Sequence, residues 1–323
     1  MTDSSAIPFD TAQDLATLHG MLDQVRMKNG WAKPTPSLYP APKPHFVPAH
    51  WKYTDARPAL HAAGRLVGTD KAERRNLIMA NPIEGNDYAT VASLVGAYQM
   101  VKAGEVARSH RHTPNAMRII LEGGPQAYTI VDGHSIPMLP GDVLLTPNGC
   151  YHGHDNQSAD EAYWIDILDV PLVQLLGPMF FEVHPDHVQT STQVNPDSPM
   201  RFAFADYLPR LMVAPEVASG VKSLVLGPAT LTTFDRTVVH MQAQTEWSRP
   251  AATPNEIWVV LRGEGYTQVQ DQRFDWQVGD LMAVPYWHAH THSASQDSIL
   301  IRMSDAPLMQ FLGWHRTGRG FPA

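Results

Sequence analysis

The sequence predicts an all-β fold made of two similar barrels, with helices before the first barrel and between the two. The first observation is an internal repeat, because Thr113-Pro114-Asn115 recurs later in the chain as Thr253-Pro254-Asn255. The second is that alternating, β-rich segments separated by turn residues fill both copies. The third is a pair of histidine-bearing segments in the first copy. Together these features indicate one barrel present twice.

The repeat continues beyond this tripeptide. Gly141-Asp142 recurs as Gly279-Asp280, and Asp169-x-Pro171-Leu172 recurs as Asp305-x-Pro307-Leu308. The separation between matching positions becomes slightly smaller from each motif to the next. This decrease indicates small loop deletions in the second copy.

The segment before the first barrel contains three predicted elements. Residues 12–29 carry apolar side chains near the 3.6-residue period and predict an amphipathic helix. Residues 33–48 contain six prolines and predict an extended arm. Residues 57–66 predict a second helix, ended by Gly68, and the β-rich part begins near Arg75.

Four parts of the chain follow from this pattern. Residues 1–55 form the N-terminal helix and arm, and residues 56–185 form the first barrel. Residues 186–225 are expected to connect the barrels, with a helix near their end, and residues 226–323 form the second barrel. The segment after Gly313 is expected to be a tail that packs on the protein or binds a neighbour.

Composition limits the function classes. The chain has 323 residues, of which 43% are hydrophobic and 17% charged, as in ordinary globular proteins. A net charge of −8 without runs of Lys or Arg argues against nucleic acid and anionic membranes as partners. A single cysteine, Cys150, excludes an internal disulfide framework. No apolar run reaches the roughly 18 residues of a membrane span and no leader is evident, so we expect a cytoplasmic protein.

Three histidines of the first copy have the spacing of a metal site. His110 and His112 are two residues apart on one predicted strand, so both side chains point to the same face. Pro147-Asn148-Gly149 suits a tight turn, and the strand after it carries His152 and His154 on a shared face. Neutral imidazole is a common ligand of Fe, Zn, Mn and Ni. We therefore predict a metal held by His110, His112 and His152.

The run from Gly104 to Asn156 resembles the cupin signature, G-x5-H-x-H followed by G-x5-P-x-G-x2-H-x3-N. The resemblance implies that each barrel is a double-stranded β-helix, or jelly roll. Cupins often carry a glutamate ligand three or four residues after the second histidine, but Ala116 and Met117 occupy these positions. Three neutral imidazoles leave the charge of a divalent ion uncompensated, which favours an anionic substrate.

The second copy lacks this ligand set. Pro250 and Ala252 are predicted at the positions of the first two histidines, which leaves Glu256 and His290 as possible ligands. Two ligands seldom hold an ion. We therefore expect the second barrel to be structural.

A wider resemblance, over nearly the whole chain, is to the bicupin gentisate 1,2-dioxygenase family, which includes salicylate, 5-nitrosalicylate and 1-hydroxy-2-naphthoate ring-cleaving enzymes. It rests on Trp51-Lys52-Tyr53, Arg74-Arg75 with Asn81-Pro82, His110-Arg111-His112-Thr113, Trp164-x-Asp166-x-x-Asp169-x-Pro171-Leu172 and Gly263-Glu264-Gly265-Tyr266. This resemblance implies an Fe(II) enzyme that uses O2 to open an aromatic ring between a carboxyl-bearing carbon and the adjacent hydroxyl-bearing carbon. It also implies a homo-oligomer, by resemblance a tetramer.

Arginines are the candidate ligands of the substrate carboxylate. Arg118 lies at an even spacing from His112 and is predicted to share its inward face. A guanidinium group can bind a carboxylate through two parallel hydrogen bonds. Arg74 or Arg75 resembles the second substrate arginine of the family, and the sequence leaves open which of them faces the pocket.

The remaining candidate site residues are polar or aromatic. His154 shares the predicted face of His152 and resembles a family histidine, so it is a candidate acid or base together with Asp166. Gln99 and Trp164 match family positions that line the substrate pocket. Cys150 is expected to be part of the pocket wall.

The expected substrate is a small aromatic 2-hydroxy carboxylate, either gentisate or a 5-substituted salicylate such as 5-nitrosalicylate. Met100 and Met117 are polarisable side chains that could accept the 5-substituent. Two other functions stay open at this point. One is a cupin isomerase, lyase or hydrolase that uses Zn²⁺ or Mn²⁺ as a Lewis acid, and the other is a non-catalytic bicupin.

Overall fold

The computed structural model describes residues 7–31, 33, 35–69, 71–72, 74–227 and 231–318. The chain forms two compact units, Met1–Lys43 and Pro44–Ala323. In the first unit a 3-10 turn, η1 (Phe9–Thr11), precedes α1 (Leu15–Gln24). The helix begins after Asp14, whose carboxylate accepts a hydrogen bond from the backbone of Thr17 at 2.7 Å.

The helix expected at residues 12–29 is therefore present but shorter at both ends. None of the described residues between 26 and 48 belongs to a helix or strand, as expected of a proline-rich arm. The capping carboxylate explains the start of the helix.

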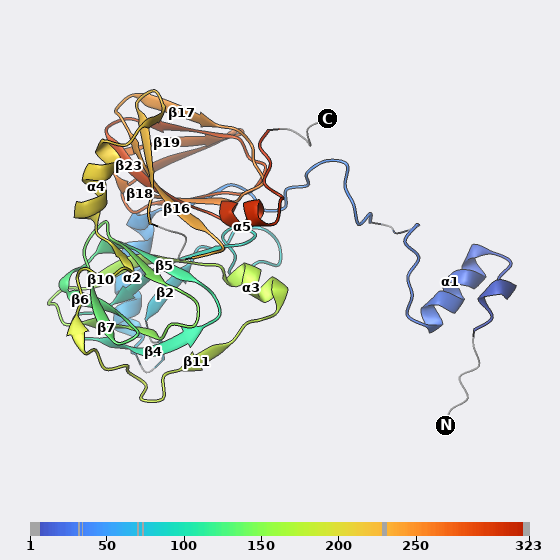
Figure 1. The fold of residues 1–323 in the computed structure, drawn as a ribbon, viewed down its shortest axis with the longest axis horizontal. Coiled ribbons are helices and arrows are strands. Elements are labelled where there is room, and N and C mark those ends of the chain that lie inside the picture. The colour runs from blue at the N-terminus through green and yellow to red at the C-terminus, as the bar shows by residue number, and fades with distance from the viewer. Residues whose placement is uncertain are drawn as a thin grey trace. The chain divides into compact units, whose positions relative to one another are not determined.

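The second unit contains the two predicted barrels (Figure 1). Each sheet of the first barrel has six strands. One sheet, in spatial order, consists of β13 (Arg201–Phe202), β8 (Val143–Thr146), β5 (Ala116–Glu122), β10 (Ala162–Leu168), β3 (Val95–Val101) and β2 (Arg75–Ile78). The other consists of β11 (Phe181–Val183), β4 (Val106–His112), β9 (His152–Asn156), β6 (Gly124–Val131), β7 (His134–Met138) and β12 (Gln193–Val194).

The second barrel repeats this arrangement. Its larger sheet consists of β1 (Ala49–Trp51), β21 (Leu281–Val284), β18 (Glu256–Arg262), β23 (Ser298–Ser304), β16 (Asp235–Met241), β15 (Val221–Val225) and β14 (Glu216–Ala218). Its smaller sheet consists of β17 (Thr245–Arg249), β22 (His290–Ala294), β19 (Glu264–Val269) and β20 (Gln272–Gln277). Short helices α3 (Val170–Leu176) and α5 (Ala306–Phe311) end the two copies. The predicted mostly-β cupin fold is confirmed.

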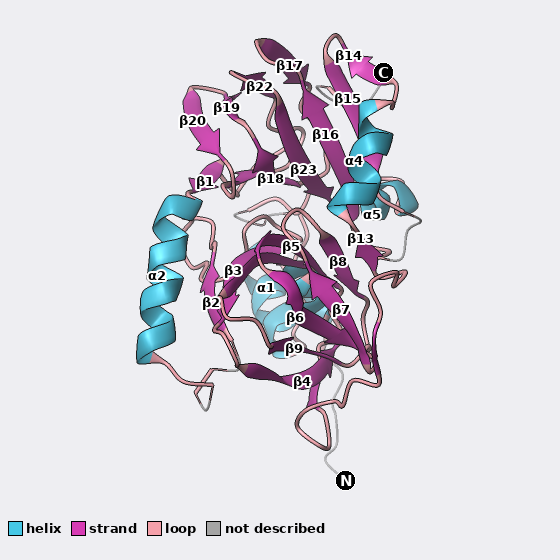
Figure 2. Ribbon diagram, turned by 90° about the vertical axis from the view of Figure 1, so that its left-hand side faces the viewer, coloured by secondary structure: helices cyan, strands magenta, loops and turns pink. Residues whose placement is uncertain are grey.

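Each barrel is completed by a strand that precedes the other barrel in sequence. Strand β1 pairs with β21 of the second barrel, and β13 pairs with β8 of the first. A helix follows each strand: α2 (Tyr53–Leu66) packs on β2 and β3, and α4 (Phe204–Met212) packs on β15 and β16 (Figure 2). Helix α2 thus begins four residues before the predicted helix, and residues 186–225 contribute strands to both barrels in addition to connecting them.

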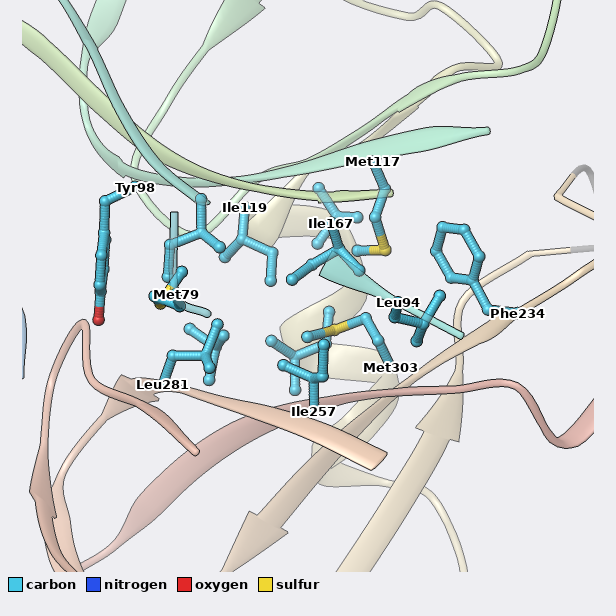
Figure 3. Packing of buried hydrophobic residues seen from close by; sticks show 14 of the residues in the cluster. Met79, Leu94, Tyr98, Met117, Ile119, Ile167, Phe234, Ile257, Leu281 and Met303 are labelled. Atoms are coloured by element: carbon cyan, nitrogen blue, oxygen red, sulfur yellow. The ribbon is translucent and has the colours of Figure 1, made fainter. Parts of the chain in front are cut away.

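The two barrels share one hydrophobic core. Met117 and Ile119 from the first barrel pack with Ile257 and Leu281 from the second, and all four are fully buried (Figure 3). Met100 belongs to the same cluster. The expectation that Met100 and Met117 could line a substrate pocket is therefore wrong. Side chains alternate along a strand, and the neighbouring residues Gln99 and Arg118 point into the first barrel. Met100 and Met117 therefore point the other way, toward the second barrel.

The described part of the C-terminal tail packs on the second barrel. The backbone of Thr253 donates to the carbonyl of Arg316 at 3.0 Å, and Thr317 forms a β-bridge with Ala252. Among the described residues, no helix is long and apolar enough to cross a membrane.

Candidate active site

Three histidines meet inside the first barrel. His110 and His112 are on β4, and His152 on β9 lies opposite His110 in the strand register. One ligand atom from each residue lies within 4.8 Å of the others, and all three side chains are buried. The alternation of β4 and the turn before β9 thus place the imidazoles as the sequence predicts.

The hydrogen bonds of these rings fit a metal. Nδ1 of His112 donates to the carbonyl of Pro114 at 2.8 Å, and Nδ1 of His152 donates to the carbonyl of Cys150 at 3.1 Å. Nε2 is then the nitrogen that carries a lone pair on each ring. Nε2 of His152 is buried and has no hydrogen-bond partner among the described residues.

Burial keeps the imidazoles of His112 and His152 neutral. It lowers the pKa of His112 to about 4, with a smaller contribution from His110. It also lowers the pKa of His152 well below the ordinary value, and the positive charge of Arg118 adds to this effect. Neutral imidazoles are the form that binds a metal ion, so the three residues fit one.

Arg118 is wholly buried beside this cluster. It lies opposite Asp166 in the register of β5 and β10, and its Nε is 3.2 Å from Asp166 Oδ1. Its Nη1 donates to the hydroxyl of Thr146. Its Nη2 is buried and has no hydrogen-bond partner in the part of the chain that the structure describes. A buried guanidinium nitrogen with an unused donor is suited to an anionic ligand.

Gln99 links this arginine to a second one. Nε2 of Gln99 donates to Asp166 Oδ2 at 2.9 Å, and its Oε1 accepts a hydrogen bond from Nε of Arg74. Arg74, Gln99, Asp166 and Arg118 thus form a continuous chain of contacts. Both oxygens of Asp166 face this chain, so the geometry makes it a group that orients the arginines.

Arg75 points elsewhere. Its guanidinium forms an ion pair with Glu105 and donates to the carbonyl of Val67 at 2.9 Å. Because Arg74 and Arg75 are neighbours in an extended segment, their side chains diverge. Only Arg74 belongs to the group around the histidines, and the prediction of Arg75 as a substrate residue is not supported by its contacts.

His154 and Trp164 pack against each other inside the barrel, with ring centroids 4.4 Å apart. Nδ1 of His154 is 3.4 Å from the hydroxyl of Thr129, and its Nε2 is buried with no hydrogen-bond partner among the described residues. Burial lowers the pKa of His154 well below its ordinary value, so the ring is neutral.

Comparisons with known proteins agree with this geometry. Residues 97–168 match the family model of the cupin domain. A gentisate 1,2-dioxygenase from Streptomyces sp is 32% identical, over 87% of this chain and 88% of that protein. A 5-aminosalicylate 1,2-dioxygenase from Comamonas sp is 30% identical, over 94% and 90%. The chain belongs to the gentisate 1,2-dioxygenase family.

The structural comparison extends over almost the whole chain. A variant of salicylate 1,2-dioxygenase from Pseudoaminobacter salicylatoxidans, solved in complex with gentisate, superposes with a TM-score of 0.87 at 25% identity and 98% coverage of both chains. This member of the family is accordingly a bicupin oxidoreductase of the gentisate 1,2-dioxygenase type.

Several residues of this dioxygenase site were not predicted from sequence. Phe181 on β11 stacks on His110 with ring centroids 4.9 Å apart, and Thr146 accepts from Arg118. Thr129 beside His154 has a counterpart in Thr267 of the second copy, and the repeat contains this signal. Cys150 is partly buried, and burial raises the pKa of its thiol to about 11, which argues against a nucleophile.

The second barrel of the dioxygenase has an arginine in place of a metal ligand. Arg249 lies opposite His290 as His110 lies opposite His152. The expectation that Pro250 occupies the position of His110 is therefore wrong by one residue. The cause is a bulge in β4 just before His110, which strand β17 lacks.

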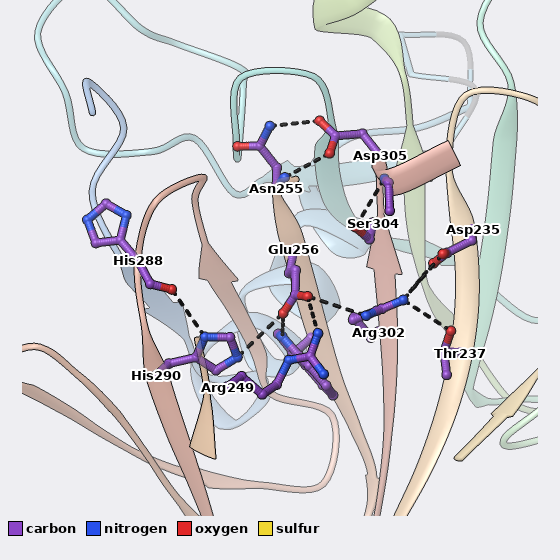
Figure 4. A network of polar contacts seen from close by, with 12 residues as sticks. Asp235, Thr237, Arg249, Asn255, Glu256, His288, His290, Arg302, Ser304 and Asp305 are labelled. Atoms are coloured by element: carbon purple, nitrogen blue, oxygen red, sulfur yellow. Dashed lines mark hydrogen bonds and ion pairs between the residues drawn. The ribbon is translucent and has the colours of Figure 1, made fainter. Parts of the chain in front are cut away.

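A partly buried ion-pair network replaces the metal site there (Figure 4). Glu256 accepts a hydrogen bond from Arg249 Nη2 at 2.6 Å and from Trp258 Nε1 at 3.0 Å. Arg302 Nη1 and His290 Nε2 each lie 3.4 Å from its oxygens. The guanidinium of Arg249 supplies a positive charge beside this carboxylate. Among the described residues, the histidines of the first barrel are the one cluster that could hold a metal ion.

Proposed function

We propose that the first barrel holds Fe(II) and that the protein cleaves the ring of gentisate or a 5-substituted salicylate between the carboxyl-bearing and hydroxyl-bearing carbons. The observation that carries the proposal is the position of three buried histidines beside two guanidinium groups. When bound, Fe(II) would supply open coordination positions and the redox chemistry of O2. The residues that would hold it are His110, His112 and His152.

The charge of the site supports an anionic substrate. Arg118 and Arg74 carry two positive charges, and Asp166 carries one negative charge in the same chain of contacts. His112 and His152 add no charge, and no glutamate stands among the three metal-binding residues. A divalent ion raises the positive charge further, and a 2-hydroxybenzoate bound through its carboxylate and phenol oxygens would offset it.

Each polar residue then has a distinct role. Arg118 Nη2 binds the substrate carboxylate, because it is the buried donor without a partner among the described residues. Gln99 and Asp166 hold Arg74 and Arg118 in place. These hydrogen bonds restrict the rotation of both guanidinium groups, which lowers the entropic cost of binding an anion.

His154 is the proposed acceptor of the phenol proton, at Nε2. Its contact with Thr129 recurs in the second barrel, where Thr267 lies 2.8 Å from Nδ1 of His292. The threonine–histidine pair therefore belongs to the fold of both barrels and does not by itself indicate a catalytic role. The positive charges of Arg118 and Arg74 lower the pKa of His154 and also favour the loss of a phenol proton nearby. Trp164 fixes the plane of this imidazole.

The choice of substrates for testing follows from the electron density that ring cleavage requires of the aromatic ring. Ring cleavage needs electron density, so gentisate, with a second hydroxyl, is the easiest substrate, whereas 5-nitrosalicylate demands more of the site. The similarity to a 5-aminosalicylate 1,2-dioxygenase supports including 5-substituted salicylates.

Oxygen uptake tests the proposal. The protein is loaded with Fe(II) without air and supplied with gentisate, salicylate, 5-chlorosalicylate, 5-nitrosalicylate or 1-hydroxy-2-naphthoate. We expect uptake with gentisate or a 5-substituted salicylate, matched mole for mole by a ring-opened product. No uptake with any of the five would contradict ring cleavage and favour a redox-inactive metal-dependent cupin.

We also propose a homo-oligomer, as the family resemblance implies. Large apolar side chains at the ends of α3 and α5 support it, since Leu175 is 80% exposed and Phe311 is 87% exposed. Light scattering coupled to size exclusion measures the mass, and a monomer at micromolar concentration would contradict the proposal.

A further inference from the structure

A polar contact from the second barrel reaches the loop that follows the metal-binding His112. Thr233 lies just before β16, the first long strand of the second barrel. Its hydroxyl donates to Asp169 Oδ2 at 2.5 Å and accepts from Asn115 Nδ2 at 3.2 Å. Both partners belong to the first barrel and are buried.

Asn115 connects this contact to His112. Its backbone and side-chain amides donate to the two oxygens of Asp169 at 2.8 Å and 3.0 Å. The residue before it, Pro114, supplies the carbonyl that accepts from Nδ1 of His112 at 2.8 Å. The position of Asn115 therefore determines where this carbonyl lies and how the imidazole is oriented.

Asn115 also holds the turn that leads to the third histidine. Its Oδ1 accepts from the backbone of Asn148 at 3.2 Å, and the backbone of Gly149 donates to the carbonyl of His112 at 3.0 Å. His152 follows this turn and donates to the carbonyl of Cys150. One asparagine thus links the loops on which two of the three histidines depend.

We propose that Thr233 is a positioning residue for the metal site of the first barrel, acting through Asp169 and Asn115. Its hydroxyl contacts both members of the pair, so it keeps the asparagine in register with the carboxylate. The proposal rests on the proposed metal site. The described residues of the second barrel include no cluster that could hold a metal ion. Through Thr233 this barrel would nevertheless contribute to the chemistry of the first barrel.

The repeat supplies a matched control. In the second barrel Asn255 donates to Asp305 through its backbone and its side chain, both at 2.7 Å (Figure 4), and Ser93 from the first barrel donates to the same carboxylate. The backbone of Tyr286 donates to Asn255 Oδ1 at 3.3 Å, as Asn148 does to its counterpart. This contact has the same chemistry but serves a barrel with Arg249 in the position of a metal ligand.

The test compares Thr233→Val with Ser93→Ala, each of which removes one hydroxyl. Apoprotein is titrated with Co²⁺ alone, and its visible absorption bands report both affinity and ligand geometry. We expect Thr233→Val to raise the Kd of Co²⁺ by about tenfold and to change the bands, as changes around metal ligands do. Ser93→Ala should keep the Kd and the bands of the wild type, and Thr233→Ser should restore both.

Each outcome decides the proposal. A wild-type Kd in Thr233→Val, or an equal rise in Thr233→Val and Ser93→Ala, would overturn the positioning role. Thr233→Ala is measured in parallel, so that a folding defect of the valine variant does not remove the test. Failure of the wild type to bind Co²⁺ would instead contradict the proposed metal site itself.

Discussion

Replacement of Arg118 by lysine keeps the positive charge but removes the planar, forked donor. Arg118 has three nitrogens in use or available: Nε beside Asp166, Nη1 on Thr146, and Nη2 without a partner among the described residues. A lysine ammonium in the same place cannot reach all three positions, so binding of a substrate carboxylate competes with the internal partners.

The magnitude follows from one hydrogen bond to a charged group. Such a bond contributes about 1.5 to 3 kcal/mol, which corresponds to a loss of roughly 10- to 150-fold in kcat/KM. The loss is measured by initial-rate oxygen uptake with the Fe(II)-loaded enzyme on the substrate that the wild type cleaves best. Metal content is determined on the same samples, because the metal ligands are unchanged and should remain occupied.

Arg75→Lys is the matched control. Arg75 is 3% exposed and Arg118 is fully buried, and each forms an ion pair with a carboxylate. Both changes therefore disturb a buried pair, but the partner of Arg75 is Glu105, away from the histidines. We expect Arg75→Lys to keep kcat/KM, with any loss confined to stability. An unchanged kcat/KM in Arg118→Lys, or an equal loss in both variants, would refute the role of Arg118.

Three further predictions concern stability. Met117→Ala should lower the free energy of unfolding by about 2 to 5 kcal/mol, because it opens a cavity between the barrels. It should leave the ratio of the kcat/KM values for two substrates unchanged. A changed ratio would show that Met117 lines the substrate pocket. Arg249→Met should cost about 3 kcal/mol in chemical unfolding, because the buried carboxylate of Glu256 loses a positively charged partner, without changing metal content. A gain of metal would be contrary to this account. Burial raises the pKa of Asp305 to about 6, so between pH 4 and pH 6 the native state holds a proton that the unfolded chain releases, and the contribution of Asp305 to stability should fall by about 2 kcal/mol over this range. Asp305→Asn should remove this part of the pH dependence, and an unaltered dependence would count against it.

The metal ligands could be predicted from sequence because they depend on local rules. Alternation along one strand and a Pro-Gly turn before another are sufficient to place His110, His112 and His152 together. The inward direction of Arg118 followed from the same alternation. The same alternation places Met117, the neighbour of Arg118, on the opposite face of the strand. It therefore also predicts that Met117 lies in the core between the barrels.

Other features depend on pairings that a single sequence does not contain. The pairing of β1 with β21 joins segments that lie far apart along the chain, and no local pattern indicates it. The position of Arg249 opposite His290 depends on a bulge that shifts one strand by a residue. The choice between Arg74 and Arg75 depended on knowing where Glu105 lies.

The central claim is that the histidine cluster of the first barrel supports insertion of O2 into a 2-hydroxybenzoate. It is tested most directly by a single turnover of the Fe(II)-loaded enzyme with ¹⁸O2 and gentisate, or with whichever substrate of the panel it cleaves, followed by mass spectrometry of the product. We predict two atoms of ¹⁸O in the ring-opened product of the wild type, apart from exchange with water, and no product from His152→Ala. A product without ¹⁸O, or an equal yield from His152→Ala, would contradict the claim.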